Sequence, residues 1–286
     1  MKDVIIVSGG NIQRDFALDF LKKNKTEKVD LIAAEDTRNS IKLLNHFEIK
    51  TPMTSYHEFN KIDKAYQLVD KLREGKNIAL ITDAGTPGIS DPGEELVKMA
   101  YEAGIEVTSL PGACACVTAL TLSGLSTRRF VFEAFLPPDK KEHKLALERL
   151  KNETRTMIVY EAPHHLLKTL RELLETLGNR RLTLCRELTK KHETAWQTTI
   201  EDAITRYEQE DPKGECVLVI EGRSQKEIED EAKAAFEEIS IEEHMKRYED
   251  QGIARKEAMK LVAKDRGVTK RDIYQYLLGK ESYNDF

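Results

Sequence analysis

Short apolar runs alternate with segments of helical periodicity along the first half of the chain. The helical segments repeat apolar residues every three or four positions, as at Ala65, Leu68, Val69 and Leu72. The apolar runs are short enough for buried strands, and four strands are predicted, at residues 4–7, 31–34, 78–82 and 105–110. Because strands that alternate with helices form βαβ units, this half is predicted to be an α/β domain with a mostly parallel sheet.

The alternation continues after Pro111 and predicts a second α/β domain. Small residues from residue 113 onward favour a tightly packed helix, and residues 136–144 are expected to form an exposed connection. Further strands are predicted at residues 130–135, 156–160, 182–185 and 216–220, with helices at 141–152, 164–177 and 199–209. The pattern leaves open whether these strands mix parallel and antiparallel pairing. The predicted fold class is α/β, with domains at residues 1–112 and 113–222 and a small helical appendix at 223–286.

Charge changes sign along the predicted appendix. Residues 223–250 carry ten acidic side chains and five basic ones, whereas residues 251–280 carry eight basic and three acidic. Capping-box spacing occurs in the pairs Ser240/Glu243 and Thr269/Asp272, and Gly252 and Gly267 separate three short helices of helix-turn-helix type. Two interpretations stay open, a solvated helical appendix and a basic RNA-contacting surface.

Composition describes a soluble globular protein. Of the 286 residues, 40% are hydrophobic and 33% charged, the net charge is −5, and the longest apolar run falls far short of a membrane helix. The start MKDVIIVSGG reads as a strand rather than a signal peptide, so a cytoplasmic protein is expected. The four cysteines show no C-x-x-C spacing, which favours buried thiols in a reducing compartment over a metal site.

Residues 81–95, ITDAGTPGISDPGEE, connect a predicted strand to a predicted helix. The segment holds three glycines, two prolines and four carboxylates, but no lysine or arginine. Ligands bind at the carboxyl ends of strands in open α/β sheets, yet the lysine and the glycine spacing of phosphate-binding loops are absent here. Asp83 and Asp91 favour a cationic ligand instead, and S-adenosylmethionine, with its sulfonium and ammonium groups, fits this description. The alternative is that GTPG and DPG form tight turns only.

The helix after this loop has predicted ends. Asp91 is expected to be its N-cap, Pro92 its first residue and Gly104 the residue that ends it.

Several segments identify a family when they are taken together. They are LIAAEDTRNS (31–40), SYHEFN (55–60), ALITDAGTPGISDPG (79–93), SLPGACA (109–115), YEAPHHL (160–166), CRELTKKHE (185–193) and KGECVLVIEG (213–222). In order and spacing they resemble the ribosomal RNA small subunit methyltransferase I family, a branch of the tetrapyrrole methylase superfamily. The resemblance implies two α/β domains with S-adenosylmethionine in the cleft between them, in a homodimer. It also implies methyl transfer to the ribose 2′-hydroxyl of a cytidine in the decoding region of 16S rRNA.

The resemblance implies which residues surround the cofactor. In the first half they are Asp83, Ala84, Gly85, Pro87, Ile89, Ser90, Asp91, Pro111, Gly112 and Ala113. In the second half they are Tyr160, Glu161, Ala162, Leu188, Gly214 and Glu215. One departure concerns the first loop of the cleft, where Ser8-Gly9-Gly10-Asn11 replaces the T-P-I-G-N of the family, so that the contacts of this loop are in doubt.

Catalysis requires alignment of the methyl donor and acceptance of the ribose hydroxyl proton. The candidates for the proton acceptor are Glu35, Asp36, His57, Glu58 and Glu161. We expect Asp36 or His57 to help activate the hydroxyl and Arg38 to contact phosphate. The alternatives are a helix N-cap with a local salt bridge for the 35–38 segment and a polar loop position for His57.

Basic residues that are candidates for contacting RNA occur in two places. They are Arg186, Lys190 and Lys191 after a predicted strand, and Arg255, Lys256, Lys270 and Arg271 in the appendix. The adjacent His164 and His165 are expected to point in different directions, which disfavours a shared metal ion, and Trp196 is open to base stacking or core packing. Two rival functions remain, a methylase of a porphyrin-like or corrin-like macrocycle and a non-catalytic RNA-binding relative.

Overall fold

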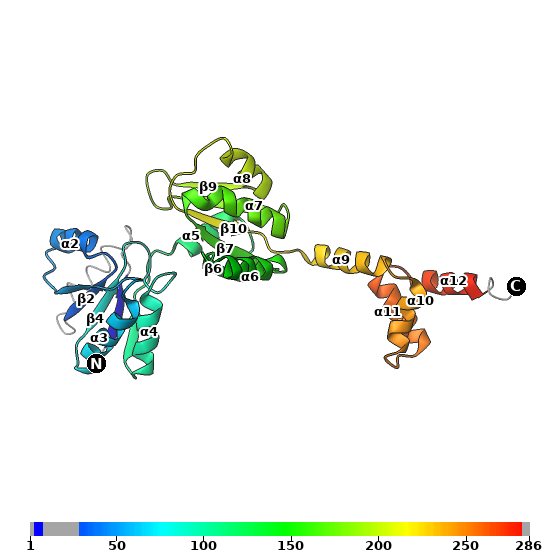
Figure 1. The fold of residues 1–286 in the computed structure, drawn as a ribbon, viewed down its shortest axis with the longest axis horizontal. Coiled ribbons are helices and arrows are strands. Elements are labelled where there is room, and N and C mark those ends of the chain that lie inside the picture. Colours follow the sequence, from blue (N-terminus) through cyan, green and yellow to red (C-terminus); the bar gives the residue numbers. More distant parts are fainter. Residues whose placement is uncertain (1–2, 8–28, 282–286) are drawn as a thin grey trace. The chain divides into compact units, whose positions relative to one another are not determined.

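The computed structural model describes residues 3–7 and 29–281. It contains two β-sheets packed with helices and a C-terminal group of helices, as the α/β fold class predicts (Figure 1). The chain divides into two compact units, one of residues up to 151 together with 155–221, and one of residues 152–154 together with 222–286. Both sheets belong to the first unit. None of the described helices is long and apolar enough to cross a membrane.

The first sheet is entirely parallel. Its strands lie in the order β3-β2-β4-β1-β5, with bounds Asp3–Val7 (β1), Leu31–Ala34 (β2), Met53–Ser55 (β3), Ile78–Ile81 (β4) and Glu106–Ser109 (β5). The predicted parallel sheet is confirmed. Sequence analysis missed β3, because three half-buried residues at the edge of a sheet carry no hydrophobic pattern. Since all five strands run the same way, the loops at their carboxyl ends leave the sheet at one edge.

Helices cover the first sheet as their periodicity predicts. They are α2 (Thr37–His46), α3 (Lys61–Arg73) and α4 (Gly93–Glu102). The buried residues of α3 are Ala65, Leu68, Val69 and Leu72, the four that the apolar spacing indicates. Gly104 follows the end of α4 with φ +69°, which confirms its predicted role.

The second sheet mixes parallel and antiparallel pairs, which the sequence left open. Its order is β6-β7-β10-β8-β9, in which only β6 and β7 are parallel. The bounds are Phe130–Phe135 (β6), Thr156–Glu161 (β7), Arg181–Arg186 (β8), Thr194–Thr199 (β9) and Cys216–Ile220 (β10). Strand β9 was not predicted, because an exposed edge strand of mostly polar residues shows no apolar run.

The helices of the second sheet enclose its main core. They are α5 (Ala115–Ser123), α6 (Lys140–Lys151), a 3₁₀ turn η1 (Pro163–His165), α7 (Leu166–Leu177) and α8 (Ile200–Tyr207). Leu166, Leu170 and Leu173 on α7 are fully buried against this core. Helix α6 begins one residue before the helix predicted at 141–152, because the Asp139 carboxylate accepts hydrogen bonds from the backbone N–H groups of Lys141 and Glu142. Its first turn overlaps the end of the connection predicted at 136–144, most of which is exposed as expected.

Up to residue 281, where the description ends, the C-terminal unit contains four helices. They are α9 (Gln225–Glu237), α10 (Ile241–Glu249), α11 (Arg255–Asp265) and α12 (Lys270–Glu281). The expected cap is present at Ser240, whose hydroxyl accepts the N–H of Glu243, and the Thr269/Asp272 box forms in both directions. The three predicted helices are therefore confirmed, and α9 is an additional one. Buried Met245, Ala258, Val262, Ala263 and Ile273 form a small core of their own.

Replacement of a core leucine tests the packing of the second sheet. Leu170→Ala is expected to lower the free energy of unfolding by about 2–5 kcal/mol, because the side chain is fully buried and its loss leaves a cavity. The measurement is urea unfolding followed by the fluorescence of Trp196, the single tryptophan, which packs against the same cluster. Leu145→Ala is the control, since Leu145 is 49% exposed and should change stability by less than about 0.5 kcal/mol. Equal effects of the two substitutions would contradict this description of the core.

Candidate cofactor and active site

The candidate residues of the first half gather at the carboxyl edge of the parallel sheet. Asp36 follows β2, His57 follows β3, Asp83 follows β4 and Pro111 follows β5. The segment Ser8–Asn11, which follows β1, lies outside the described residues. Parallel pairing thus brings segments together that lie far apart in the sequence.

The loop after β4 is held in shape by the Asp91 carboxylate. Its oxygens accept hydrogen bonds from the backbone N–H of Gly88 at 2.9 Å and from that of Gly93 at 2.7 Å. A Cβ atom at Gly93 would lie 2.8 Å from the Gly88 nitrogen, so this turn requires glycine. The predicted N-cap at Asp91 is wrong by one residue, since Pro92 occupies that position. Both Asp91 oxygens accept hydrogen bonds within the loop.

Two side chains of the EDTR segment and α2 support the start of the same loop. The Glu35 carboxylate accepts hydrogen bonds from the Thr82 hydroxyl and from the Asp83 N–H, and the Asn39 side-chain amide donates to the Asp83 carboxylate at 2.9 Å. Glu35 therefore positions the loop. The exposed Asp83 carboxylate keeps one oxygen for which no hydrogen bond is seen among the described residues.

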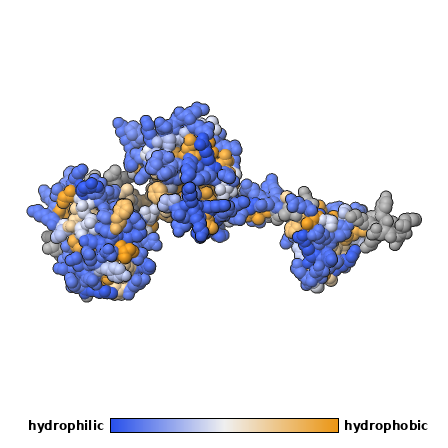
Figure 2. All heavy atoms as spheres, in the orientation of Figure 1, coloured by the Kyte–Doolittle hydropathy of each residue, from blue (hydrophilic) through white to orange (hydrophobic). Residues whose placement is uncertain are grey.

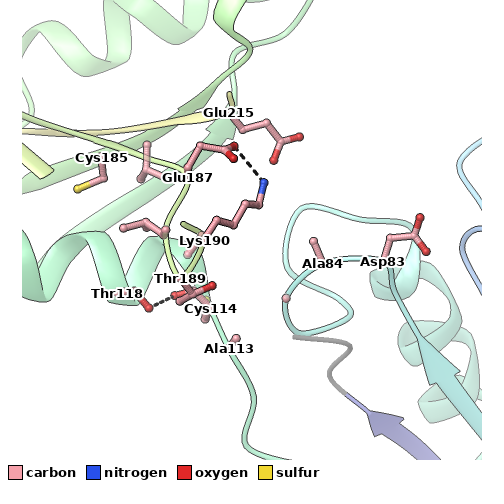
Figure 3. A pocket seen from close by; sticks show the side chains of 14 residues that line it. Asp83, Ala84, Ala113, Cys114, Thr118, Cys185, Glu187, Thr189, Lys190 and Glu215 are labelled. Carbon is pink, nitrogen blue, oxygen red and sulfur yellow. Dashed lines mark hydrogen bonds and ion pairs between the residues drawn. The ribbon is translucent and has the colours of Figure 1, made fainter. Parts of the chain in front are cut away.

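A pocket of about 220 Å³ lies between this loop, the segment after β5 and the second sheet (Figure 3). Seven residues that the sequence singled out line it, namely Asp83, Ala84, Gly85, Ala113, Leu188, Lys190 and Glu215. Seven others were not predicted, namely Cys114, Ala115, Thr118, Cys185, Glu187, Thr189 and Val217. The structure therefore brings both halves of the predicted cofactor site to one cavity.

The charge of the pocket suits a cationic ligand. Its ionisable carboxylates are Asp83, Glu187 and Glu215, and its one ammonium, Lys190, is paired with Glu187 at 3.0 Å (Figure 3). Glu187 and Thr189 have φ angles of +49° and +66°, in the left-handed region that residues with a side chain rarely adopt. Backbone strain of this kind concentrates at functional sites, where surrounding contacts maintain it. Glu187 follows β8 directly, and the sequence analysis did not predict it as a site residue because only basic residues of the CRELTKKHE segment were candidates for contacts.

Comparison with known proteins agrees with this site. Residues 23–204 match the family of tetrapyrrole (corrin/porphyrin) methylases. The ribosomal RNA small subunit methyltransferase I of Halalkalibacterium halodurans is 49% identical over 87% of this chain and 85% of its own length. The protein of the same name from Synechocystis sp. is 46% identical over 90% of both chains. The chain belongs to the ribosomal RNA small subunit methyltransferase I family.

More distant solved structures share the fold alone. Uroporphyrin-III-C-methyltransferase from Thermus thermophilus has a TM-score of 0.51 at 19% identity, covering 77% of this chain and 94% of that one. Diphthine synthase has a TM-score of 0.54 at 10% identity, covering 77% and 90%. Membership in the methyltransferase I family makes S-adenosylmethionine the cofactor, and the three carboxylates of the pocket fit its cationic groups.

Several residues that the family resemblance assigns to the cofactor do not line this pocket. These are Pro87, Ile89, Ser90, Asp91, Pro111, Gly112, Tyr160, Glu161, Ala162 and Gly214. The Tyr160 hydroxyl accepts the N–H of Cys116 at 2.9 Å, and buried Glu161 binds the Thr169 hydroxyl and its neighbour's N–H. Gly214 has φ +75°, and any side chain there would collide with the Glu187 carboxylate.

The candidate catalytic residues differ in the hydrogen bonds that their side chains make. Asp36 is the N-cap of α2, and its carboxylate accepts hydrogen bonds from the backbone and the guanidinium of Arg38, which hold its pKa at about 2. The N-cap and the local salt bridge, which were the alternative interpretation of residues 35–38, are thus both present. His57 is half-buried, and its Nδ1 has no hydrogen-bond partner among the described residues. Neighbouring Tyr56 donates to the Pro92 carbonyl at 2.8 Å and so fixes this loop.

The remaining candidates show mixed surroundings. Arg186 donates to the Thr194 hydroxyl, and Lys191 is exposed. The ring centroids of His164 and His165, in the 3₁₀ turn η1, lie 4.2 Å apart, so the expectation that the two side chains point in different directions is wrong. Trp196 packs partly against the core, with the Arg206 guanidinium over its ring at 4.7 Å.

Cys114 is the only one of the four cysteines that is not fully buried. Its sulfur lies 3.3 Å from that of Cys116, whose thiol hydrogen bond lowers the pKa of Cys114 to about 6. Burial raises the pKa of Cys185 to about 11 and that of Cys216 to about 12. Since the thiolate is the reactive form, the pocket contains a single thiol that is reactive near neutral pH.

Alkylation of Cys114 should report on the pocket. Iodoacetamide is expected to modify Cys114 alone at pH 7, with a rate that rises as pH passes through about 6, whereas an ordinary thiol reacts near its pKa of about 8.5. Mass spectrometry of peptides measures the rate, and S-adenosylmethionine should slow it by covering the pocket. Cys116→Ala is the matched control and should move the midpoint up toward the ordinary value. A midpoint that stays the same in this variant would contradict the sulfur–sulfur contact.

Proposed function

We propose that this protein transfers the methyl group of S-adenosylmethionine to the ribose 2′-hydroxyl of a cytidine in the decoding region of 16S rRNA. The observation that carries the proposal is the similarity of 45–49% over 85–90% of the length of relatives named ribosomal RNA small subunit methyltransferase I. The proposal that the reaction takes place at the carboxyl edge of the parallel sheet is supported by the carboxylate-lined pocket there. A homodimer in the cytoplasm is part of the same proposal.

The pocket residues have distinct roles in this proposal. S-adenosylmethionine supplies an electrophilic methyl group on a sulfonium. The Asp83, Glu187 and Glu215 carboxylates would hold its cationic groups, and Gly85 and Ala113 would let the backbone approach it closely. Asn39 orients the Asp83 carboxylate by its hydrogen bond. The remaining implied residues, from Pro87 to Asp91 and from Tyr160 to Ala162, belong to the proposed cofactor site on the family resemblance alone.

For the hydroxyl proton we favour His57 over Asp36. A carboxylate with a pKa of about 2 is a weak base near neutral pH, and both Asp36 oxygens already accept hydrogen bonds from Arg38. In this proposal the His57 imidazole takes up the proton; its Nε2 lies 3.3 Å from the Asn60 side-chain nitrogen, and its Nδ1 is buried without a hydrogen-bond partner among the described residues. Asp36 then positions Arg38, whose side chain is 88% exposed and suited to a phosphate of the RNA.

The position of the transferred methyl group tests the reaction. Tritiated S-adenosylmethionine is supplied with small ribosomal subunits that lack the modification, and the RNA is then hydrolysed in alkali. A 2′-O-methyl group blocks attack of the ribose oxygen on the neighbouring phosphate, so the label should appear in alkali-resistant dinucleotides. Label in mononucleotides would indicate base methylation and contradict the proposal. Transfer only to a porphyrin or corrin precursor, supplied in parallel, would favour the macrocycle methylase.

Charge reversal in the pocket tests the cofactor site. Asp83→Lys should weaken S-adenosylmethionine binding more than tenfold, or about 1.4 kcal/mol, because it replaces an attractive charge by a repulsive one. Isothermal titration calorimetry measures the affinity. Glu94→Lys makes the same charge change at an exposed position of the same loop region outside the pocket, and it should bind like the unaltered protein. If the two variants bind equally well, the loop is only a turn.

Separate effects are expected for binding and for proton transfer. His57→Ala should lower the rate of methyl transfer by about 10²–10⁴-fold, the range of general-base contributions, with cofactor affinity unchanged. Asp36→Asn, which keeps a side chain able to cap α2, should lower the rate much less. Single-turnover transfer to small subunits measures both. A larger loss in Asp36→Asn than in His57→Ala would reverse the assignment.

A further inference from the structure

A basic groove lies between the last two helices of the C-terminal unit. Arg255, Lys256 and Met259 of α11 and Lys270, Arg271 and Tyr274 of α12 line a cavity of about 670 Å³. Four of these six side chains are cationic and none is acidic. One of the other two is the aromatic Tyr274. Figure 2 shows that the visible surface of the molecule is mostly hydrophilic, with scattered hydrophobic areas.

The placement of these cations works against the stability of both helices. Arg255 and Lys256 are the first two residues of α11, and Lys270 and Arg271 are the first two of α12. Helix N-termini carry a partial positive charge, so cations there are unfavourable and anions are favourable. Local folding therefore does not explain the four basic side chains, whereas binding of an anion in the groove does.

Three of the groove cations, Lys256, Lys270 and Arg271, lack the ion pairs that other cations of the unit make within its described part. Lys260, one turn further along α11, binds Glu257 at 2.8 Å, and the Asp272 carboxylate is occupied by the Thr269 N–H and hydroxyl. Within the described residues, Lys256, Lys270 and Arg271 make no ion pair with a carboxylate. The Lys260 ammonium lowers the pKa of Glu257 most, and the charges of Lys270 and Lys256 lie near enough to lower it further. The hydrogen bonds from Thr269 lower the pKa of Asp272 most, and the charge of Arg271 lowers it further. None of the three groove cations is held by a direct carboxylate contact among the described residues.

Tyr274 adds a surface for stacking. Its side chain is 51% exposed. The adjacent Ile273 is only 1% exposed and packs in the small core of the unit, which holds α12 in place. Met259 is half-buried against the same small core and forms the apolar floor. An exposed aromatic ring between cations matches an unpaired nucleotide, whose base can stack while its phosphates contact lysine and arginine.

We propose that the α11–α12 groove binds a single-stranded segment of RNA, with Tyr274 stacked on a base and Lys256, Lys270 and Arg271 on its phosphates. The inference rests on the proposed RNA substrate and assigns a separate binding surface to the C-terminal unit. A duplex fits less well, because its bases are already stacked on one another and present no free face.

Fluorescence anisotropy with the full chain tests the phosphate contacts. The probe is a labelled oligocytidine of about 12 nucleotides, within the usual range of single-strand sites. Lys256→Gln/Lys270→Gln/Arg271→Gln should weaken binding more than tenfold and reduce the slope of log affinity against log salt by about 2, since each phosphate contact contributes about 0.7. The control, Lys226→Gln/Lys246→Gln/Lys264→Gln, removes the same charge from exposed positions of this unit outside the groove. Equal losses in both variants, or an absence of RNA binding by the unaltered chain, would overturn the proposal.

Two substitutions of one residue test the stacking. Tyr274→Ala should weaken binding at least about fivefold, whereas Tyr274→Phe, which keeps the ring, should stay within about twofold. Tight binding of a duplex of the same length, or unchanged binding by Tyr274→Ala, would contradict stacking. Circular dichroism verifies that the variants keep their helices. S-adenosylmethionine binding should be unchanged in all of these variants. If the variants change RNA binding as described but the protein transfers no methyl group to RNA, then the proposed reaction is wrong and the RNA-binding groove is right.

Discussion

Parallel pairing of the five strands in the first sheet is the constraint on which the candidate site depends. It places the residues that follow β2, β3, β4 and β5 at one edge, although 75 residues of sequence separate Asp36 from Pro111. Reversal of any one strand would send its loop to the opposite edge. The backbone ladder therefore assembles the site before any side chain contributes to it.

The two aspartates of the loop after β4 divide two tasks between them. Asp91 binds backbone N–H groups and keeps the loop in one shape, which lowers the entropy that a ligand would otherwise have to remove. Asp83 is supported by Asn39 and remains exposed in the pocket. The loop therefore contains the tight turns that the sequence indicates, and the proposed cofactor site uses the Asp83 carboxylate that these turns leave exposed.

Unfavourable local arrangements occur at both proposed binding surfaces. In the pocket, Glu187 and Thr189 adopt backbone angles that favour glycine. In the C-terminal unit, cations occupy the first turns of α11 and α12, where the helix dipole opposes them. Each arrangement lowers the stability of its own element, so the surrounding packing has to maintain it. Such places are where local sequence rules are expected to fail for functional reasons.

The sequence by itself determined the α/β class, the eight strands with clear apolar runs, the helices with a buried stripe and the caps of the C-terminal helices, because these depend on neighbouring residues and on hydrophobic period. It missed β3 and β9, edge strands whose polar residues follow no pattern. Only the tertiary structure decided the pairing of the second sheet, the inward use of Asp91 and the entry of Glu187 and Cys114 into the pocket. These depend on which groups meet across the fold, and hydrogen bonds between distant segments leave no local signal in a chain.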